Sequence, residues 1–218
     1  MQVPQDVQGI LSRILESEDK WKALYMGVWG YSYVLAQTKG TLDWTTTFPR
    51  GLPASKIKFH PYTNEQLHKL LTNMDDYISL NHLQDMFSLL EDLVGISCQY
   101  ISSTPTINPG DYGQLKSFIL AENQHAQSTK GTARAPLISV TEEQNLNLAK
   151  KTRNCFIHKG GLVDDNWINA YKAAKGTQCP YPLKAKLPRK VTHVQKIEDW
   201  HELIVKIADC LEQEIQAI

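Results

Sequence analysis

The sequence is poor in cysteine, has no excess of charge of either sign and contains no long apolar run. Its four cysteines, among 218 residues, stand too far apart for a Cys-x-x-Cys metal or redox pair. They are also too few for a disulfide-stapled secreted module, so we expect reduced thiols in a cytoplasmic protein. Lys and Arg number 23, and so do Asp and Glu, which excludes a molecule-wide basic field that attracts nucleic acid.

No segment has the length and hydrophobicity of a membrane span. The longest uncharged runs, 23–38 and 93–110, are interrupted by glycine, proline or polar residues, whereas a span needs about 20 predominantly apolar residues. The amino terminus lacks the basic flank and apolar run of a signal peptide. We therefore expect a soluble protein, and its 42% of hydrophobic residues suffices for one domain over residues 1–218.

Apolar residues recur at helical spacing in every strongly patterned stretch, and no alternating run predicts a substantial sheet. The sequence therefore predicts an all-α fold, a helical bundle with long connecting loops at about 40–63, 124–140 and 175–193. The clearest helix covers 194–217. Its apolar stripe consists of Ile197, Trp200, Leu203, Ile204, Ile207, Ala208, Leu211 and Ile215.

Earlier stretches predict further helices. Two apolar stripes precede Gly40, and Asp19 can begin the second of them. A long pattern covers 64–101, where one continuous helix would be about 57 Å long, more than the width of a small domain. We therefore expect a break near 79–81, where Ser and Asn compete for backbone hydrogen bonds. A weaker helix is predicted over 111–123.

Charge is unevenly distributed although its sum is zero. The stretch between Glu143 and Asp164 contains four basic residues and no acidic one, and the stretch between Asp165 and Glu198 contains seven basic residues and again no acid. The 64–101 region is mainly acidic. This asymmetry permits a phosphate-facing side on a neutral protein. The alternative is a solvated face beside a flexible basic loop.

One further predicted helix carries the residues of greatest chemical interest. Thr141 and Gln144 suit a capping box at its start, and Gly160-Gly161 is a stop signal. Near its end stand Arg153, Asn154 and His158. At 100° per residue, Asn154 and His158 lie about 40° apart on the helix surface, and the long arm of Arg153 can converge with them. Three polar groups can therefore face one ligand.

The order Arg153-Asn154, three residues, His158 and then Gly160-Gly161 resembles the signature of HEPN-domain proteins. Those are helical bundles, many of them metal-independent ribonucleases of toxin–antitoxin, phage-defence and RNA-processing systems. The resemblance implies that Arg153, Asn154 and His158 are active-site residues and that the cleft forms across a homodimer. It also implies RNA as substrate and an antitoxin or defence partner. An acid from an earlier helix often lies near the family's His, and the candidates here are Asp76, Asp85, Glu91 and Asp92.

The chemistry of these side chains fits such a reaction. Histidine can take or give a proton, and Arg presents a planar fork to two phosphate oxygens. At a helix C-terminus the macrodipole stabilises a protonated imidazole, which favours the acid role for His158. One His per chain cannot be acid and base at once, so a dimer partner supplies the second. Non-specific phosphate attraction is expected from Lys150, Lys151 and Lys159.

The same segment also has a plainer interpretation. An Arg near a helix end can form a structural ion pair, and a His before two glycines can act as a cap. A non-catalytic helical module that binds a protein or RNA partner is therefore the alternative function.

No metal site or cofactor is expected. His193 with His201, and His60 with His68, lack the spacing and companion carboxylates of a zinc site, so we expect solvated histidines. No glycine-rich phosphate loop or Gly-x-Ser-x-Gly nucleophile motif is present.

Overall fold

The computed structural model describes residues 2–37, 63–72, 74–101, 107–122, 134–188 and 194–218. In these ranges every regular element is an α-helix, which confirms the all-α prediction, and an isolated bridge joins Leu162 to Lys186. None of the described helices is long and apolar enough to cross a membrane. The helices are α1 (Gln5–Gln37), α2 (Asn64–Thr72), α3 (Met74–Ile101), α4 (Tyr112–Ile119), α5 (Val140–Lys159), α6 (Asp165–Lys175) and α7 (Val194–Gln216).

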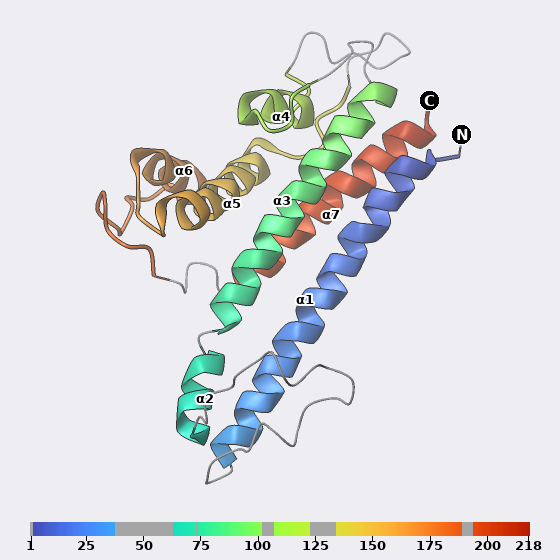
Figure 1. The fold of residues 1–218 in the computed structure, drawn as a ribbon. Helices are drawn as coiled ribbons and strands as arrows, with labels where there is room; N and C mark the ends of the chain where they lie inside the picture. The colour runs from blue at the N-terminus through green and yellow to red at the C-terminus, as the bar shows by residue number, and fades with distance from the viewer. Residues whose placement is uncertain (1, 38–62, 73, 102–106, 123–133, 189–193) are drawn as a thin grey trace.

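Three long helices, α1, α3 and α7, run side by side and enclose the main hydrophobic core (Figure 1). Periodic apolar side chains from each of them are buried there, among them Ile14, Phe87, Leu90 and Ile204. α2 lies beside the C-terminal end of α1, and both chain termini lie at the opposite end of the bundle. Helix α7 matches its predicted range to within one residue because its stripe faces this core along its whole length.

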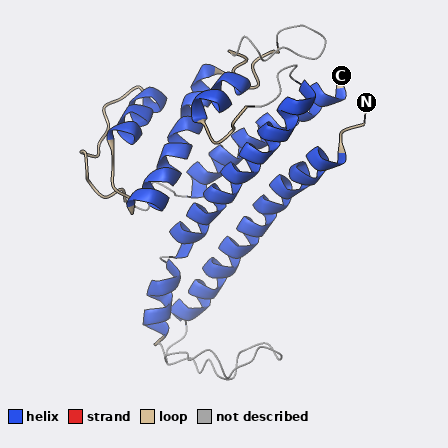
Figure 2. Cartoon of the chain, turned by 45° about the horizontal axis from the view of Figure 1, so that its top comes forward, coloured by secondary structure: helices blue, strands red, loops and turns tan. Residues whose placement is uncertain are grey.

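A second, smaller core lies to one side of the bundle, between α5, α6 and the segment that follows α6 (Figure 2). Its buried residues are Leu148, Cys155, Val163, Trp167, Ala170 and Leu187. The backbone of Val163 exchanges hydrogen bonds with Lys184 and Ala185, which fixes the returning segment beside α5. The described parts of two predicted loops, 134–139 and 176–188, are non-helical, and the predicted loop at 40–63 lies almost wholly outside the described residues.

The first helix is continuous, so the expected start of a second helix at Asp19 is wrong. Helix α1 runs through Asp19 without interruption. Ion pairs one turn apart, Glu16 with Lys20 and Glu18 with Lys22, bridge the position at which a break was expected.

The break in the 64–101 region falls earlier than 79–81, between α2 and α3 and just before Met74. Ser79 is buried within α3 and does not end the helix. The apolar stripe of α3 continues on both sides of it, with Leu83 buried in the main core and the half-buried Ile78 packed against that core. Tertiary packing therefore outweighs the local preference of Ser and Asn.

Two histidine rings and an indole stack inside the bundle. Trp21 and His82 lie 4.9 Å apart between ring centroids, and His82 and His201 lie 5.2 Å apart. His201 is buried, so the expectation of a solvated ring is wrong for this residue, and its Nε2 lies 3.2 Å from Oε2 of Glu18. Burial lowers the pKa of His82 to about 3 and also lowers the pKa of His201. No cluster of metal-ligating side chains occurs among the described residues.

We expect the free energy of unfolding to fall as the pH is lowered from about 6.5 toward about 3. In this window His82 takes up a proton in the unfolded chain but stays neutral in the folded protein, so the unfolded state binds more protons. The slope is at most about 1.4 kcal/mol per pH unit for each ring. Urea titrations of wild type and His82→Phe at several pH values measure it. Equal pH dependence in both proteins would contradict the role of His82.

Candidate functional site

Helix α5 carries all the residues of the predicted site, and its ends are well defined. The cap at its start is Ser139, whose hydroxyl accepts from the Glu142 amide while the Glu142 carboxylate accepts from the Ser139 amide. The expected cap at Thr141 with Gln144 is therefore wrong by two residues. The predicted stop is confirmed: Gly160 has φ of 58°, and the Gly161 amide donates to the Cys155 carbonyl.

Arg153 and Asn154 are held together near the end of α5. Arg153 Nη1 donates to Asn154 Oδ1 at 3.2 Å, and both side chains are half-buried. Arg153 Nε is buried without a hydrogen-bond partner among the described residues. One of the five N–H donors of the guanidinium is bonded to Asn154, so other donors remain for a ligand.

His158 lies one turn further on and is exposed. Within the described residues its ring makes no recorded hydrogen bond or ion pair, including with Arg153 or Asn154. The structure thus joins two of the three predicted residues and leaves the third open to solvent on the last turn of the same helix.

Exposure increases steadily along the face of α5 that bears the motif. Glu143 and Lys150 are buried, Asn154 is half-buried and His158 is exposed. These positions fall within about 80° of one another around the helix, so they form one stripe. The bundle covers the start of the stripe and leaves its end uncovered.

The buried part of this stripe is fixed by polar contacts with neighbouring helices. Lys150 Nζ lies 2.7 Å from Glu91 Oε1 of α3 and 5.4 Å from the centre of the Tyr112 ring of α4. The Tyr112 hydroxyl donates to Glu143 Oε1 at 2.6 Å, and burial together with this bond raises the pKa of Tyr112. Glu91, one of the four acids considered from the sequence, forms an ion pair with α5.

The three predicted phosphate-binding lysines have different surroundings. Lys150 is buried against Glu91, so its ammonium does not face solvent. Lys159 is exposed but pairs with Asp164, which raises the pKa of its ammonium. Lys151 is half-buried and has no ion pair within the described part of the chain.

Helix α6 is not among the helices predicted from the sequence. Asp164 caps it by accepting from the Trp167 amide, and Gly176 ends it with φ of 64°. The Trp167 indole N–H donates to Thr152 Oγ1 at 2.9 Å, which ties α6 to α5. The signal was present in the sequence as Asp164 at the start and a Gly after the last turn.

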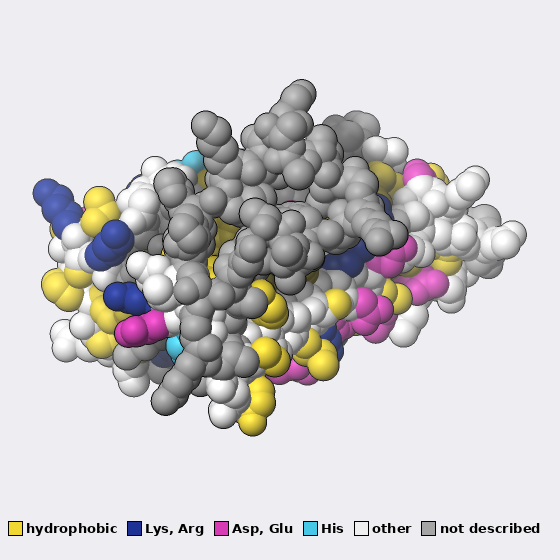
Figure 3. All heavy atoms as spheres, turned by 60° about the horizontal axis from the view of Figure 1, so that its bottom comes forward, with side chains coloured by type: hydrophobic (Ala, Val, Ile, Leu, Met, Phe, Trp, Pro, Cys, Tyr) yellow, Lys and Arg dark blue, Asp and Glu magenta, His cyan; other side chains and the backbone are white. Residues whose placement is uncertain are grey.

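The surface around these helices carries both signs of charge. Figure 3 shows Lys and Arg side chains mainly toward the left, the side of α5 and α6 in Figure 1, and Asp and Glu mainly toward the right. Exposed lysines of α6 and the segment after it include Lys172, Lys175, Lys184 and Lys186. Basic charge is therefore local, as the sequence predicts for a neutral chain.

Comparisons with protein-family models, with curated proteins and with solved structures give no match to this chain.

We expect Glu91→Gln to lower the free energy of unfolding by about 1–3 kcal/mol, because it leaves the buried Lys150 ammonium without its counter-charge. Asp92→Asn, at the exposed neighbouring position, is the control and should change stability by less than about 0.5 kcal/mol. Urea unfolding monitored by circular dichroism measures both. Equal effects of the two substitutions would show that the pair does not hold α5 in place.

Proposed function

We propose that this chain is a metal-independent endoribonuclease of HEPN type. The proposal rests on one observation: α5 holds Arg153 against Asn154 and presents an exposed His158 one turn later, just before the Gly160 stop. The arrangement retains the residue types that the resemblance implies, on one helix end. An antitoxin or defence partner follows from the resemblance alone.

In the proposed reaction the 2′-hydroxyl of RNA loses a proton and attacks the adjacent phosphorus. The 5′-oxygen leaves with a proton, and the product strand ends in a 2′,3′-cyclic phosphate. Arg153 neutralises the phosphorane oxygens through its remaining N–H donors, and Asn154 holds the guanidinium in place. His158 transfers a proton at the exposed end of the helix.

A homodimer is part of the proposal, for two reasons. The reaction needs a base and an acid, whereas each chain supplies one His158 to the site. The motif-bearing stripe of α5 also becomes uncovered toward His158, where a second copy can pack. A twofold axis near this end brings two Arg153, Asn154 and His158 sets to one cleft.

A second candidate is a non-catalytic helical module that binds a protein or RNA partner. Within the described chain His158 has no hydrogen bond to Arg153 or Asn154, and Lys150 and Lys159 are committed to internal pairs. Such a module retains RNA binding when His158 is replaced and never cuts the strand.

The decisive measurement is cleavage of mixed single-stranded RNA in the presence of EDTA. We expect His158→Ala to lower the cleavage rate by about 10²-fold or more, because a proton-transfer group is lost. Lys159→Ala, at the adjacent exposed position, is the matched control and should retain most of the activity. RNA binding by both wild type and His158→Ala, without strand scission by either, would favour the non-catalytic module.

The dimer is tested separately by sedimentation of the full chain across a concentration series. We expect a homodimer, and we expect an excess of His158→Ala to lower the cleavage rate of wild type mixed with it, because a mixed dimer holds one of the two imidazoles that the reaction needs. A monomer that cleaves RNA at all concentrations would refute the shared cleft.

A further inference from the structure

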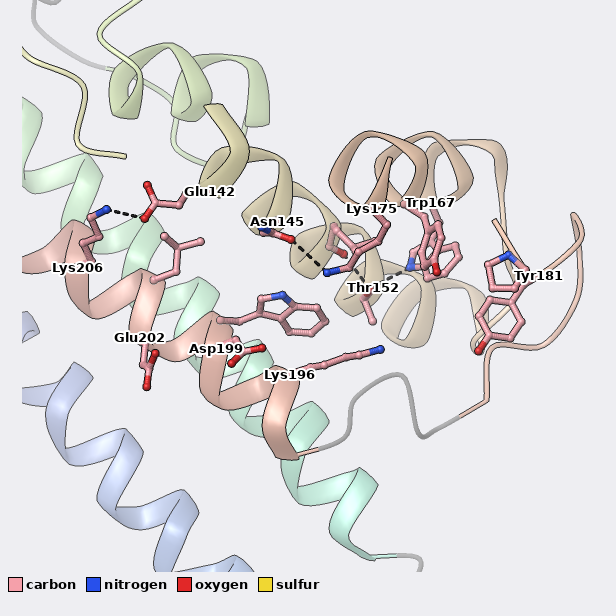
Figure 4. A pocket seen from close by; sticks show the side chains of 15 residues that line it. Glu142, Asn145, Thr152, Trp167, Lys175, Tyr181, Lys196, Asp199, Glu202 and Lys206 are labelled. Carbon is pink, nitrogen blue, oxygen red and sulfur yellow. Dashed lines mark hydrogen bonds and ion pairs between the residues drawn. The ribbon is translucent and has the colours of Figure 1, made fainter. Parts of the chain in front are cut away.

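A cavity of about 580 Å³ lies between α5, α6 and α7 (Figure 4). α5 contributes Asn145, Leu148 and Thr152, which form one face of that helix. Thr152 and Asn154 point about 160° apart around the helix axis, so the cavity is on the opposite side of α5 from the proposed cleft. Neither Arg153, Asn154 nor His158 lines it.

The cavity separates the two hydrophobic cores. Leu148 and Trp167 belong to the small core, and Trp200 and Leu203 belong to the bundle core. The space is open to solvent, because exposed side chains such as Lys175, Glu202 and Lys206 line it together with the buried ones. Its volume falls within the range of about 300–1,000 Å³ that is typical of small-molecule sites.

The walls of the cavity are rich in aromatic rings. Four of its 15 lining residues are aromatic, against 9% in the whole chain. They are Trp167, Tyr171, Tyr181 and Trp200. Trp167 and Trp200 are 1% and 6% exposed, so the accessible aromatic surface comes mainly from the half-buried Tyr171 and Tyr181. Such rings favour a flat aromatic ligand over an extended aliphatic one.

The charged groups of the cavity differ between its two ends. Figure 4 shows Lys206 joined to Glu142 at one end, a 2.5 Å contact that lowers the pKa of Glu142 to about 2. This ammonium is therefore neutralised. Lys175, nearer Tyr181, donates to the uncharged amide oxygen of Asn145 at the long distance of 3.5 Å and forms no ion pair with a described residue. A ligand anion can replace that contact.

The lining as a whole limits the charge of the ligand. Lys175, Lys196 and Lys206 are balanced by Glu142, Asp199 and Glu202. A dianion such as a phosphate monoester meets three carboxylates in this setting, whereas one carboxylate is matched by the ammonium of Lys175.

We propose that the cavity between α5, α6 and α7 binds a planar aromatic monocarboxylate, with its ring against Tyr171 and Tyr181 and its carboxylate on Lys175. The site is separate from the proposed ribonuclease cleft and does not depend on that function.

The test uses 2-naphthoate, titrated into the full chain by calorimetry and followed by tryptophan fluorescence. We expect saturable 1:1 binding that is about tenfold tighter than that of the neutral analogue 2-naphthol, because the charged contact is worth about 1.4 kcal/mol. Cyclohexanecarboxylate, which lacks the aromatic ring, should bind more weakly than 2-naphthoate. Absence of saturable binding of 2-naphthoate at millimolar concentration would overturn the proposal.

Two variants test whether the ligand binds in this cavity. Lys175→Gln should remove the preference for 2-naphthoate over 2-naphthol, whereas Lys172→Gln, on α6 but outside the lining, should retain it. Asn145→Phe fills the cavity and should abolish binding while the chain remains folded by circular dichroism. His158→Ala should bind normally, which separates this proposal from the ribonuclease proposal. Unchanged affinity in both Lys175→Gln and Asn145→Phe would overturn the assignment.

Discussion

The orientation of α5 depends on the ion pair between Lys150 and Glu91. A buried ammonium is costly unless a carboxylate meets it, so α5 is held in the rotation that turns Lys150 toward α3. The Tyr112 hydroxyl adds a second constraint on the same face through Glu143. Because Glu143 and Lys150 face the neighbouring helices α3 and α4, the directions of the other side chains around α5 are also set. Asn154 follows Lys150 by one turn, and Thr152 faces the opposite side, toward Trp167 and α6.

This constraint explains why the fold was predictable in some regions and not in others. Helix α7 has one uninterrupted apolar stripe against the main core, so periodicity alone located it. The Gly160 stop was equally clear because its left-handed conformation suits glycine. The break before Met74 was misplaced because packing of Ile78 and Leu83 keeps α3 helical through Ser79. α6 was missed because it is short, at 11 residues, and packs against a small core, although Asp164 and Gly176 mark its ends.

The candidate site was predictable in composition but not in its surroundings. The spacing of Arg153, Asn154 and His158 placed them on one helix end, where the structure has them. The burial of Lys150 was not foreseeable. In the sequence Lys150 looks like the neighbouring lysines, and nothing there shows that Glu91 of α3 faces it in the fold. The cavity was equally hidden, since its aromatic walls come from four separate positions between 167 and 200.

The two faces of α5 are held by different kinds of contact. The motif side is held by contacts to the carboxylates of Glu91 and Glu143. The cavity side is held by the hydrogen bond between Trp167 and Thr152, which carries no charge. Because Lys206 also ties Glu142 to α7, the N-terminal turn of α5 remains attached until the pH approaches the lowered pKa of Glu142, about 2. The ring of His158, on the outermost turn, is exposed and forms no hydrogen bond with a described residue, so contacts within the described chain fix it less than they fix Asn154.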